Sequence, residues 1–320
     1  MLQELFAQNK NIVINSDIDG FLCGMILQHY YGCQVVGFSD SHDTVWIIPE
    51  ITDMDSPVYI DLFVSRPRTI CIDQHIIAYD QQAHNQIVGY GTKMNPNLDR
   101  NRTFTGNGGD DYKFKYPFGT VHYLIYLMAK EGITVSLPNL NQVYNLTNPL
   151  TERQLPAVTP GLVLTRADDA LHTTLQAYRD NALDWWTWLN PQNQFTSITT
   201  ITNYINGLNT DNSFAYKRTI GDFFLQLGCD QQDGAFHNVV DKNGRLLDKV
   251  LVYRDILSRI IGYGLTLPTD YLTHLGQYAC RPASADYCHR ALNGQRVYSY
   301  AFIWGPWSQK ANFSFTFDMV

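Results

Sequence analysis

Three short apolar segments near the start of the chain each run into an aspartate. The three acids are Asp17, Asp61 and Asp73, and the residues before them are rich in Ile and Val. Segments of this kind are typical of buried strands in a parallel sheet. The carboxyl ends of parallel strands meet at one edge of the sheet, so we expect these three carboxylates to converge.

Carboxylates gathered at one sheet edge need a compensating positive charge. Several of them a few ångströms apart cannot all stay ionised without a cation, and oxygen-rich sites usually take a hard divalent one. Asp17 and Asp19 stand two residues apart on a tight loop closed by Gly20, so both can reach one ion. His75 adds an imidazole, which suits a manganese-type ion. The pattern therefore predicts a divalent-metal site.

A structural role is the alternative for each acid taken alone. Aspartate is a common turn former and a favoured helix N-cap, and Asp19, ahead of the helix expected to begin at Phe21, is the strongest candidate for a cap. Three apolar strands that each end in an aspartate, one followed two residues later by His75, favour the metal site over local turns.

The succession of these motifs resembles that of the DHH phosphoesterase superfamily. This superfamily includes RecJ-like exonucleases, nano-RNA and pAp phosphatases, cyclic-dinucleotide phosphodiesterases and family II pyrophosphatases. Its members use a two-manganese site at the carboxyl edge of a parallel sheet. The resemblance covers about residues 10 to 175 and is carried by Asn15–Gly20, Tyr59–Asp61, Cys71–His75, Asn95–Asn97 and Leu164–Asp168.

The resemblance implies a role for each matching residue. Two manganese ions, with magnesium as the alternative, would be ligated by Asp17, Asp19, Asp61 and Asp168. Asp61 would bridge the ions, and His75 would be the catalytic residue that faces the scissile phosphate. Asp169 stays an alternative to Asp168, because adjacent helix residues cannot both point inward. Weak ligands, or residues that support the ligands, would be Asn15, Asp73 and Gln74.

Three residues farther along are candidates for contact with substrate: Asn95, Asn97 and Lys115. The two asparagines belong to the matching motifs. Lys115 belongs to a basic cluster around a glycine-bearing loop, where ammonium groups suit phosphate oxygens. A solvated loop surface is the alternative interpretation of that cluster. The expected function is that of a manganese-dependent phosphoesterase, a hydrolase of short oligonucleotides, cyclic nucleotides or nucleoside bisphosphates.

Some features depart from the superfamily pattern. Gln74 stands where relatives have a metal-ligating histidine, and Asn15 stands where many have a histidine or aspartate. The second domain shows no glycine-rich, histidine-containing substrate loop near its end. The alternative function is therefore a DHH-fold protein that binds a nucleotide without turnover. A metal-free cofactor site is a third interpretation, but no GxGxxG motif follows a strand.

The elements that must position these residues alternate between strand and helix, which predicts an α/β fold with a parallel sheet. The expected strands are 11–15, 34–38, 45–48, 57–61, 69–73, 296–302 and 312–317. The expected helices are 21–31, 118–130, 166–189 and 248–263. Periodicity is lost over residues 79–115, which predicts a long functional loop.

We expect two domains: a DHH-like metal-binding phosphoesterase domain at 1–190 and a smaller α+β substrate-binding domain at 226–320, joined by a linker at 191–225. The net charge of −7, from 23 basic and 30 acidic residues, argues against binding of long duplex nucleic acid. No long apolar run or signal peptide is evident, which predicts a cytoplasmic protein without a membrane partner. A homodimer stays open.

Overall fold

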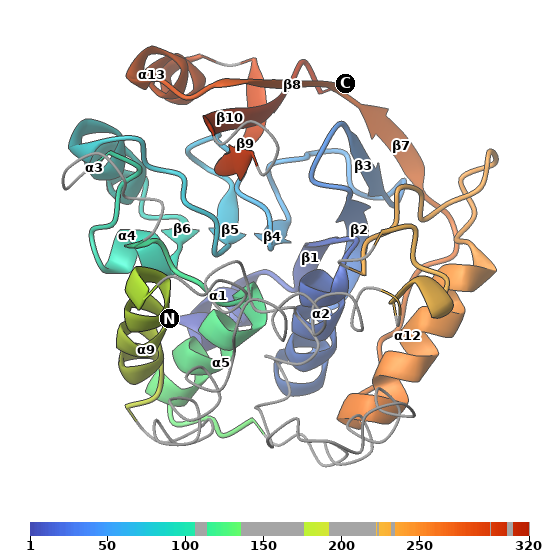
Figure 1. Ribbon diagram of the computed structural model, residues 1–320. Helices are drawn as coiled ribbons and strands as arrows, with labels where there is room; N and C mark the ends of the chain where they lie inside the picture. Colours follow the sequence, from blue (N-terminus) through green and yellow to red (C-terminus); the bar gives the residue numbers. More distant parts are fainter. Residues whose placement is uncertain are drawn as a thin grey trace.

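The structure is a computed structural model that describes residues 1–105, 114–135, 176–191, 222, 224–231, 234–294, 296–305 and 310–319. Its main sheet has seven strands in the order β6-β5-β4-β1-β2-β3-β7. The first five are parallel, β3 pairs antiparallel with β2, and β7 pairs antiparallel with β3, so only β3 opposes the direction of the others. The predicted α/β class with a mostly parallel sheet is confirmed (Figure 1). The strands are β1 Asn11–Asn15, β2 Gln34–Ser39, β3 Thr44–Ile47, β4 Val58–Ile60, β5 Ile70–Ile72, β6 Lys93–Met94 and β7 Leu272–Leu275.

The central strand β1 is buried on both faces of the sheet. Ile12 and Ile14 belong to the largest core cluster, whereas Val13 belongs to a smaller cluster on the opposite face. This alternation follows from the two-residue period of a strand. A continuous apolar run is what a strand covered on both sides requires, so the sequence pattern and the position of β1 agree.

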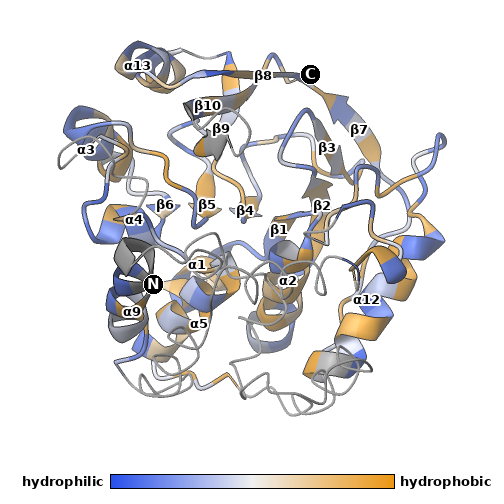
Figure 2. Cartoon of the chain, in the orientation of Figure 1, coloured by the Kyte–Doolittle hydropathy of each residue, from blue (hydrophilic) through white to orange (hydrophobic). Residues whose placement is uncertain are grey.

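Several helices share the largest core with the sheet. In Figure 2, α2 carries apolar residues over much of its surface, and every residue from Ile18 to Leu27 is buried. The helices that carry labels in the described chain are α1 Leu2–Gln8, α2 Ile18–Tyr31, α3 Gln81–Gly89, α4 Pro96–Asp99, α5 Thr120–Lys130, α9 Gln176–Leu189, α12 Asp248–Ile261 and α13 Ala285–Asn293.

A second, antiparallel sheet lies beyond the carboxyl edge of the parallel strands (Figure 1). Its strands are β8 Gln277–Pro282, β9 Val297–Gly305 and β10 Lys310–Phe317, in the order β8-β10-β9. Ser299 of β9 bridges to Val64, just after β4, and the amide of Phe302 donates to the carbonyl of Ile76, just after β5, at 3.0 Å. The small sheet therefore covers the edge at which the predicted site residues gather.

The prediction of one long loop over residues 79–115 is wrong in part. Residues 81–99 form α3, β6 and α4, which fit no clear periodicity because they are short. Only Ala83, His84 and Ile87 of α3 are buried, and β6 has two residues. Tertiary packing fixes elements that local pattern does not reveal.

The predicted domain limits stay predictions, because most of the predicted linker lies outside the described residues. The late strand β7 nevertheless pairs with β3 in the main sheet, and α12 packs on α2. Late segments of the chain thus contribute to both sheets. Within the part of the chain that the structure describes, no helix has the length and apolar character needed to cross a bilayer.

Candidate metal centre

The order in which the chain adds strands to the sheet changes direction at β1. It passes from β1 to β2 and β3 on one side, and then returns to β4, β5 and β6 on the other. In open α/β sheets, the crevice at such a switch point, beyond the carboxyl ends of the strands, is where ligands bind. Polar residues follow every parallel strand at this edge: Asp17 after β1, Asp40 after β2, Asp61 after β4, Asp73 after β5 and Asn95 after β6.

Asp61, Asp73 and His75 form a cluster at this edge. Each offers one ligand atom, and these atoms all lie within 4.8 Å of one another. The two carboxylates are buried, while the side chain of His75 is 35% exposed. Two oxygen donors and one imidazole at this separation can hold one divalent ion.

Asp61 is held in a fixed position from three sides. Its backbone is left-handed, with φ of 60°, and its amide donates to the carbonyl of Ile72 at 2.8 Å. Its carboxylate accepts hydrogen bonds from the hydroxyl of Thr120 and from the amide of Asn15. Burial raises the pKa of Asp61; His75 opposes this shift and Asp73 adds to it. A cation at this position would offset the cost of the buried charge.

Asp73 orients His75. One oxygen of Asp73 lies 2.7 Å from Nδ1 of His75, and its other oxygen accepts from the backbone amide of His75 at 3.2 Å. Burial favours the neutral imidazole, but the charges of Asp73 and then Asp61 outweigh it and raise the pKa of His75 to about 9. Nδ1 is thus engaged by Asp73, while Nε2 lies 3.3 Å from the side-chain nitrogen of Gln74.

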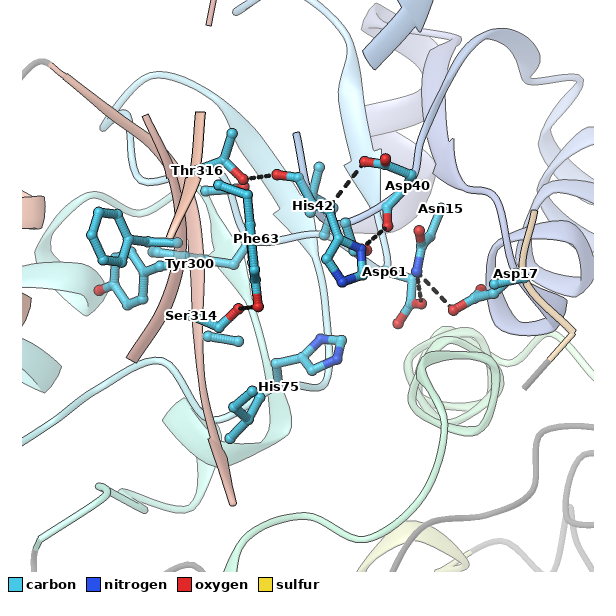
Figure 3. A pocket seen from close by; sticks show the side chains of 18 of the residues that line it. Asn15, Asp17, Asp40, His42, Asp61, Phe63, His75, Tyr300, Ser314 and Thr316 are labelled. Carbon is cyan, nitrogen blue, oxygen red and sulfur yellow. Dashed lines mark hydrogen bonds between the residues drawn. The ribbon is translucent and has the colours of Figure 1, made fainter. Parts of the chain in front are cut away.

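Asn15 joins two carboxylates at the end of β1. Its side-chain nitrogen donates to Asp17 at 2.7 Å and to Asp61 at 3.1 Å (Figure 3). Its side-chain oxygen accepts from the amide of Ser16 at 3.0 Å, which fixes the orientation of the amide group. The polar hydrogens of Asn15 thus occupy a position between two anions.

The prediction that Asp19 caps α2 is wrong, because Asp17 is the N-cap and accepts from the amide of Gly20 at 3.0 Å. Asp19 lies inside the first turn and is buried. Its carboxylate accepts from the backbone amide of Val121 at 3.3 Å, at the N-terminus of α5, where the helix dipole favours an anion. Burial and then the charge of Asp61 raise the pKa of Asp19 well above its usual value.

The predicted substrate residues support the loop that carries His75. The amide of Asn95 donates to the carbonyl of His75 at 2.8 Å, and that of Asn97 donates to the carbonyl of Gln74 at 2.8 Å. Both asparagines are buried, so in this structure they hold the loop in place. Lys115 lies near enough to His75 for its charge to act against the protonated imidazole.

The remaining predicted residues fall into two groups. The Nε2 atom of Gln74 lies 3.3 Å from Nε2 of His75, so both side chains reach the same space. Asp168 and its alternative Asp169 lie outside the described residues, so the fourth predicted ligand stays a prediction.

A cavity of about 350 Å³ opens next to the cluster, between the two sheets. Its lining includes Asn15, Asp17, Asp61 and His75 on one side and residues of β9 and β10 on the other, among them Tyr300, Ser314 and Thr316 (Figure 3). This volume is in the range of small-molecule sites.

Sequence reasoning missed three contributors to this site. Asp40 and His42 line the cavity, and Asp40 follows an apolar strand just as Asp61 does, so the same pattern identifies it. Thr120 contacts Asp61 across 59 positions of sequence, and no sequence signal marks that contact.

Comparison with protein families, with curated proteins and with solved structures finds no match to this chain.

Proposed function

We propose that this protein is a divalent-metal-dependent phosphoesterase of the DHH type that acts on small nucleotides. The observation that carries the proposal is the cluster of Asp61, Asp73 and His75, whose ligand atoms lie within 4.8 Å of one another beside a cavity of about 350 Å³. Carboxylates and an imidazole at the switch point of a parallel sheet are suited to hold an ion next to a phosphate group.

The donor set fits a hard or borderline divalent ion such as manganese. Asp61 and Asp73 supply carboxylate oxygens, and His75 supplies an imidazole nitrogen. Bound there, the ion would stabilise charge on phosphoryl oxygens and lower the pKa of a water molecule.

The residues around the cluster perform the positioning that such chemistry requires. Thr120 and Asn15 fix the carboxylate of Asp61, and Asp73 fixes the imidazole of His75. Lys115, near His75, adds positive charge close to the cluster. Supporting contacts of this kind hold metal ligands in the geometry needed for binding.

The arrangement of Asn15 favours one tightly held ion. In the DHH-type arrangement two ions would share Asp61, but the amide of Asn15 already donates to Asp61 and Asp17. Two hydrogen bonds from a neutral amide satisfy these carboxylates in part. A second ion would therefore gain less binding free energy from Asp17 and Asp61. We propose that the cluster of Asp61, Asp73 and His75 binds the stronger ion.

The same observation favours a second candidate function, that of a nucleotide-binding protein without turnover. Asn15 and Gln74 are neutral amides in positions where charged or imidazole ligands would hold a second ion. A protein that keeps one ion and the cavity can still bind a phosphate ester. It would lack the second charge that two-ion sites use to stabilise the attacking and leaving oxygens.

Calorimetric titration of the metal-free protein with manganese tests the proposal, together with hydrolysis of dinucleotides, cyclic dinucleotides and nucleoside bisphosphates. We expect Asp61→Asn to lose at least about tenfold in manganese affinity, because it removes one charged ligand. The matched control Asp255→Asn, on the exposed part of α12, should leave affinity unchanged. Metal binding without hydrolysis of any ester would support the second candidate. If manganese does not bind, or binds Asp61→Asn equally well, the metal centre is refuted.

A further inference from the structure

Two exposed aromatic side chains, one from each sheet, meet on the wall of the cavity. His42 follows β2 of the main sheet, and Tyr278 belongs to β8 of the second sheet. Both line the cavity that also contains Asp61 and His75. Their ring centroids are 4.9 Å apart, and the ring planes are inclined by 57°. Neither ring belongs to the metal cluster, so this aromatic pair is a separate feature of the same cavity.

Hydrogen bonds hold both rings in place. Nδ1 of His42 lies 2.8 Å from the carbonyl oxygen of Asp40, and the hydroxyl of Thr316 in β10 donates to the carbonyl of His42. The hydroxyl of Ser314, also in β10, donates to the hydroxyl of Tyr278 at 3.0 Å (Figure 3). Rings that are already fixed lose little conformational entropy when a ligand binds to them.

The aromatic pair lies on the cavity wall and not in the core. The two side chains that contact Tyr278, those of His42 and Ser314, both line the cavity, and Tyr278 is 39% exposed. In Figure 3 the imidazole of His42 points into the cavity. By contrast, Phe63 and Tyr300 are buried, and their rings pack edge-to-face against each other. The pair of His42 and Tyr278 is therefore an aromatic surface that a ligand in the cavity can reach.

The cavity offers a phosphate ester few positive partners. Among the described residues that line it there is no lysine or arginine. A phosphate in the cavity would therefore depend on the ion and on His75 for its attraction. Further affinity has to come from the part of the ligand that lies away from the metal centre, and the aromatic pair is the surface available to it. An apolar, flat group is what such a surface binds best.

We propose that the rings of Tyr278 and His42 form a stacking platform for the nucleobase of the ligand. The inference rests on the proposed function, because the phosphate of the same ligand lies at the metal centre. Stacking on an aromatic side chain tolerates every base, since each base has a π face. The expected ligand is a nucleotide of any base, and a sugar phosphate that lacks a base is expected to bind weakly.

Calorimetry with adenosine 5′-monophosphate and with ribose 5-phosphate, both in the presence of manganese, measures what the base contributes. We expect the wild type to bind the nucleotide about tenfold more tightly, which is the usual contribution of stacking on one aromatic side chain. Tyr278→Leu should lose this advantage, while its affinities for manganese and for ribose 5-phosphate are unchanged. Tyr278→Phe keeps the ring and should keep the advantage, which separates stacking from the structural role of the hydroxyl.

A matched control and a second readout sharpen the test. Leu275 in the neighbouring strand β7 is 55% exposed and is not among the described residues that line the cavity, so Leu275→Ala should leave both affinities unaltered. The fluorescence of 2-aminopurine riboside 5′-monophosphate is quenched when its base stacks. We expect quenching on binding to the wild type and to Tyr278→Phe, and little quenching with Tyr278→Leu.

The outcomes separate this inference from the proposed function. If manganese does not bind and no ester is hydrolysed, but adenosine 5′-monophosphate still binds better than ribose 5-phosphate in a Tyr278-dependent way, the phosphoesterase proposal fails and the stacking platform stands. If manganese binds and esters are hydrolysed, but the base adds no affinity or Tyr278→Leu weakens both ligands equally, the stacking platform alone is overturned. Failure of the wild type to bind the nucleotide would overturn the platform as well.

Discussion

The side-chain nitrogen of Asn15 lies 3.1 Å from a carboxylate oxygen of Asp61, although the two residues are 46 positions apart in the chain. The contact exists because β1 and β4 are parallel neighbours, with Ile14 and Ile60 in register one residue earlier. It places a neutral donor next to the most constrained acid of the metal centre.

Replacing Asn15 with aspartate should strengthen metal binding and weaken the metal-free protein. Asn15→Asp exchanges a donor for a third carboxylate beside Asp17 and Asp61, so the metal-free form should lose about 1–3 kcal/mol of unfolding free energy. An added anionic ligand should raise manganese affinity about tenfold or more. Denaturant melts and calorimetry with Asn15→Asp and Asn15→Ala measure both effects. An alanine variant that gains as much affinity would show that the new charge is not responsible.

Gln74→His should also raise manganese affinity. The side-chain nitrogen of Gln74 lies 3.3 Å from Nε2 of His75, so an imidazole placed here reaches the space beside this nitrogen. Imidazole is a better ligand for such ions than an amide oxygen. Titration of the metal-free variant is expected to show an affinity about tenfold higher than that of the wild type. Weaker binding would mean that residue 74 does not face the ion.

Gly119→Ala should damage the site through steric overlap alone. A Cβ atom at Gly119 would overlap both carboxylate oxygens of Asp19, and the backbone there is not left-handed. Because Asp19 or the start of α5 must move, we expect a loss of about 1–3 kcal/mol in unfolding free energy. Gly89→Ala is the matched control, because a Cβ there meets no atom within 4 Å and alanine favours a helix. If both variants are equally stable, the close packing around Asp19 is not maintained in solution.

Buried His122 should make the protein less stable in mild acid. Burial lowers its pKa from 6.5 to about 4, so between these values only the unfolded chain binds the proton. Stability therefore rises with pH through this window and is lost as pH falls through it. Each pKa unit is worth about 1.4 kcal/mol, so His122 contributes a loss of roughly 3 kcal/mol between about pH 6.5 and pH 4.

The stability of the wild type minus that of His122→Gln isolates this effect, since other titrating groups are common to both. Chemical denaturation across the same pH range should show the difference shrinking in acid. A difference that stays constant with pH would indicate that His122 binds a proton as readily in the folded protein as in the unfolded chain.

The fold could be predicted where burial makes the pattern continuous. The run before Asn15 is apolar on both faces because β1 is the central strand, and Asp17, Asp61 and Asp73 follow such runs. The edge strand β7 gave no comparable signal. Its two leucines, Leu272 and Leu275, are exposed, and the four residues of the strand show no alternation between buried and exposed side chains. Its position depends on pairing with β3, which no local pattern encodes.

The sequence predicts the candidate site only to the extent that each residue's position follows from the strand that precedes it. The convergence of Asp61 and Asp73 follows from parallel strands that end at one edge. The hydrogen-bond partners of Asp61 cannot be predicted in this way. Asn15 reaches Asp61 only because β4 lies beside β1, and Thr120 reaches it only because α5 begins at that edge. Such contacts depend on strand order and helix placement, which are long-range properties.

The pairing of β3 with β7 also constrains how the protein can be made. While the chain is being synthesised, β3 has its open edge exposed until residues 272–275 have left the ribosome. An unpaired edge of this kind is a template for association with other chains, and nascent proteins are most at risk in that interval. Translation speed and chaperone access late in synthesis, after the metal-centre strands have already emerged, should therefore influence the yield of native protein.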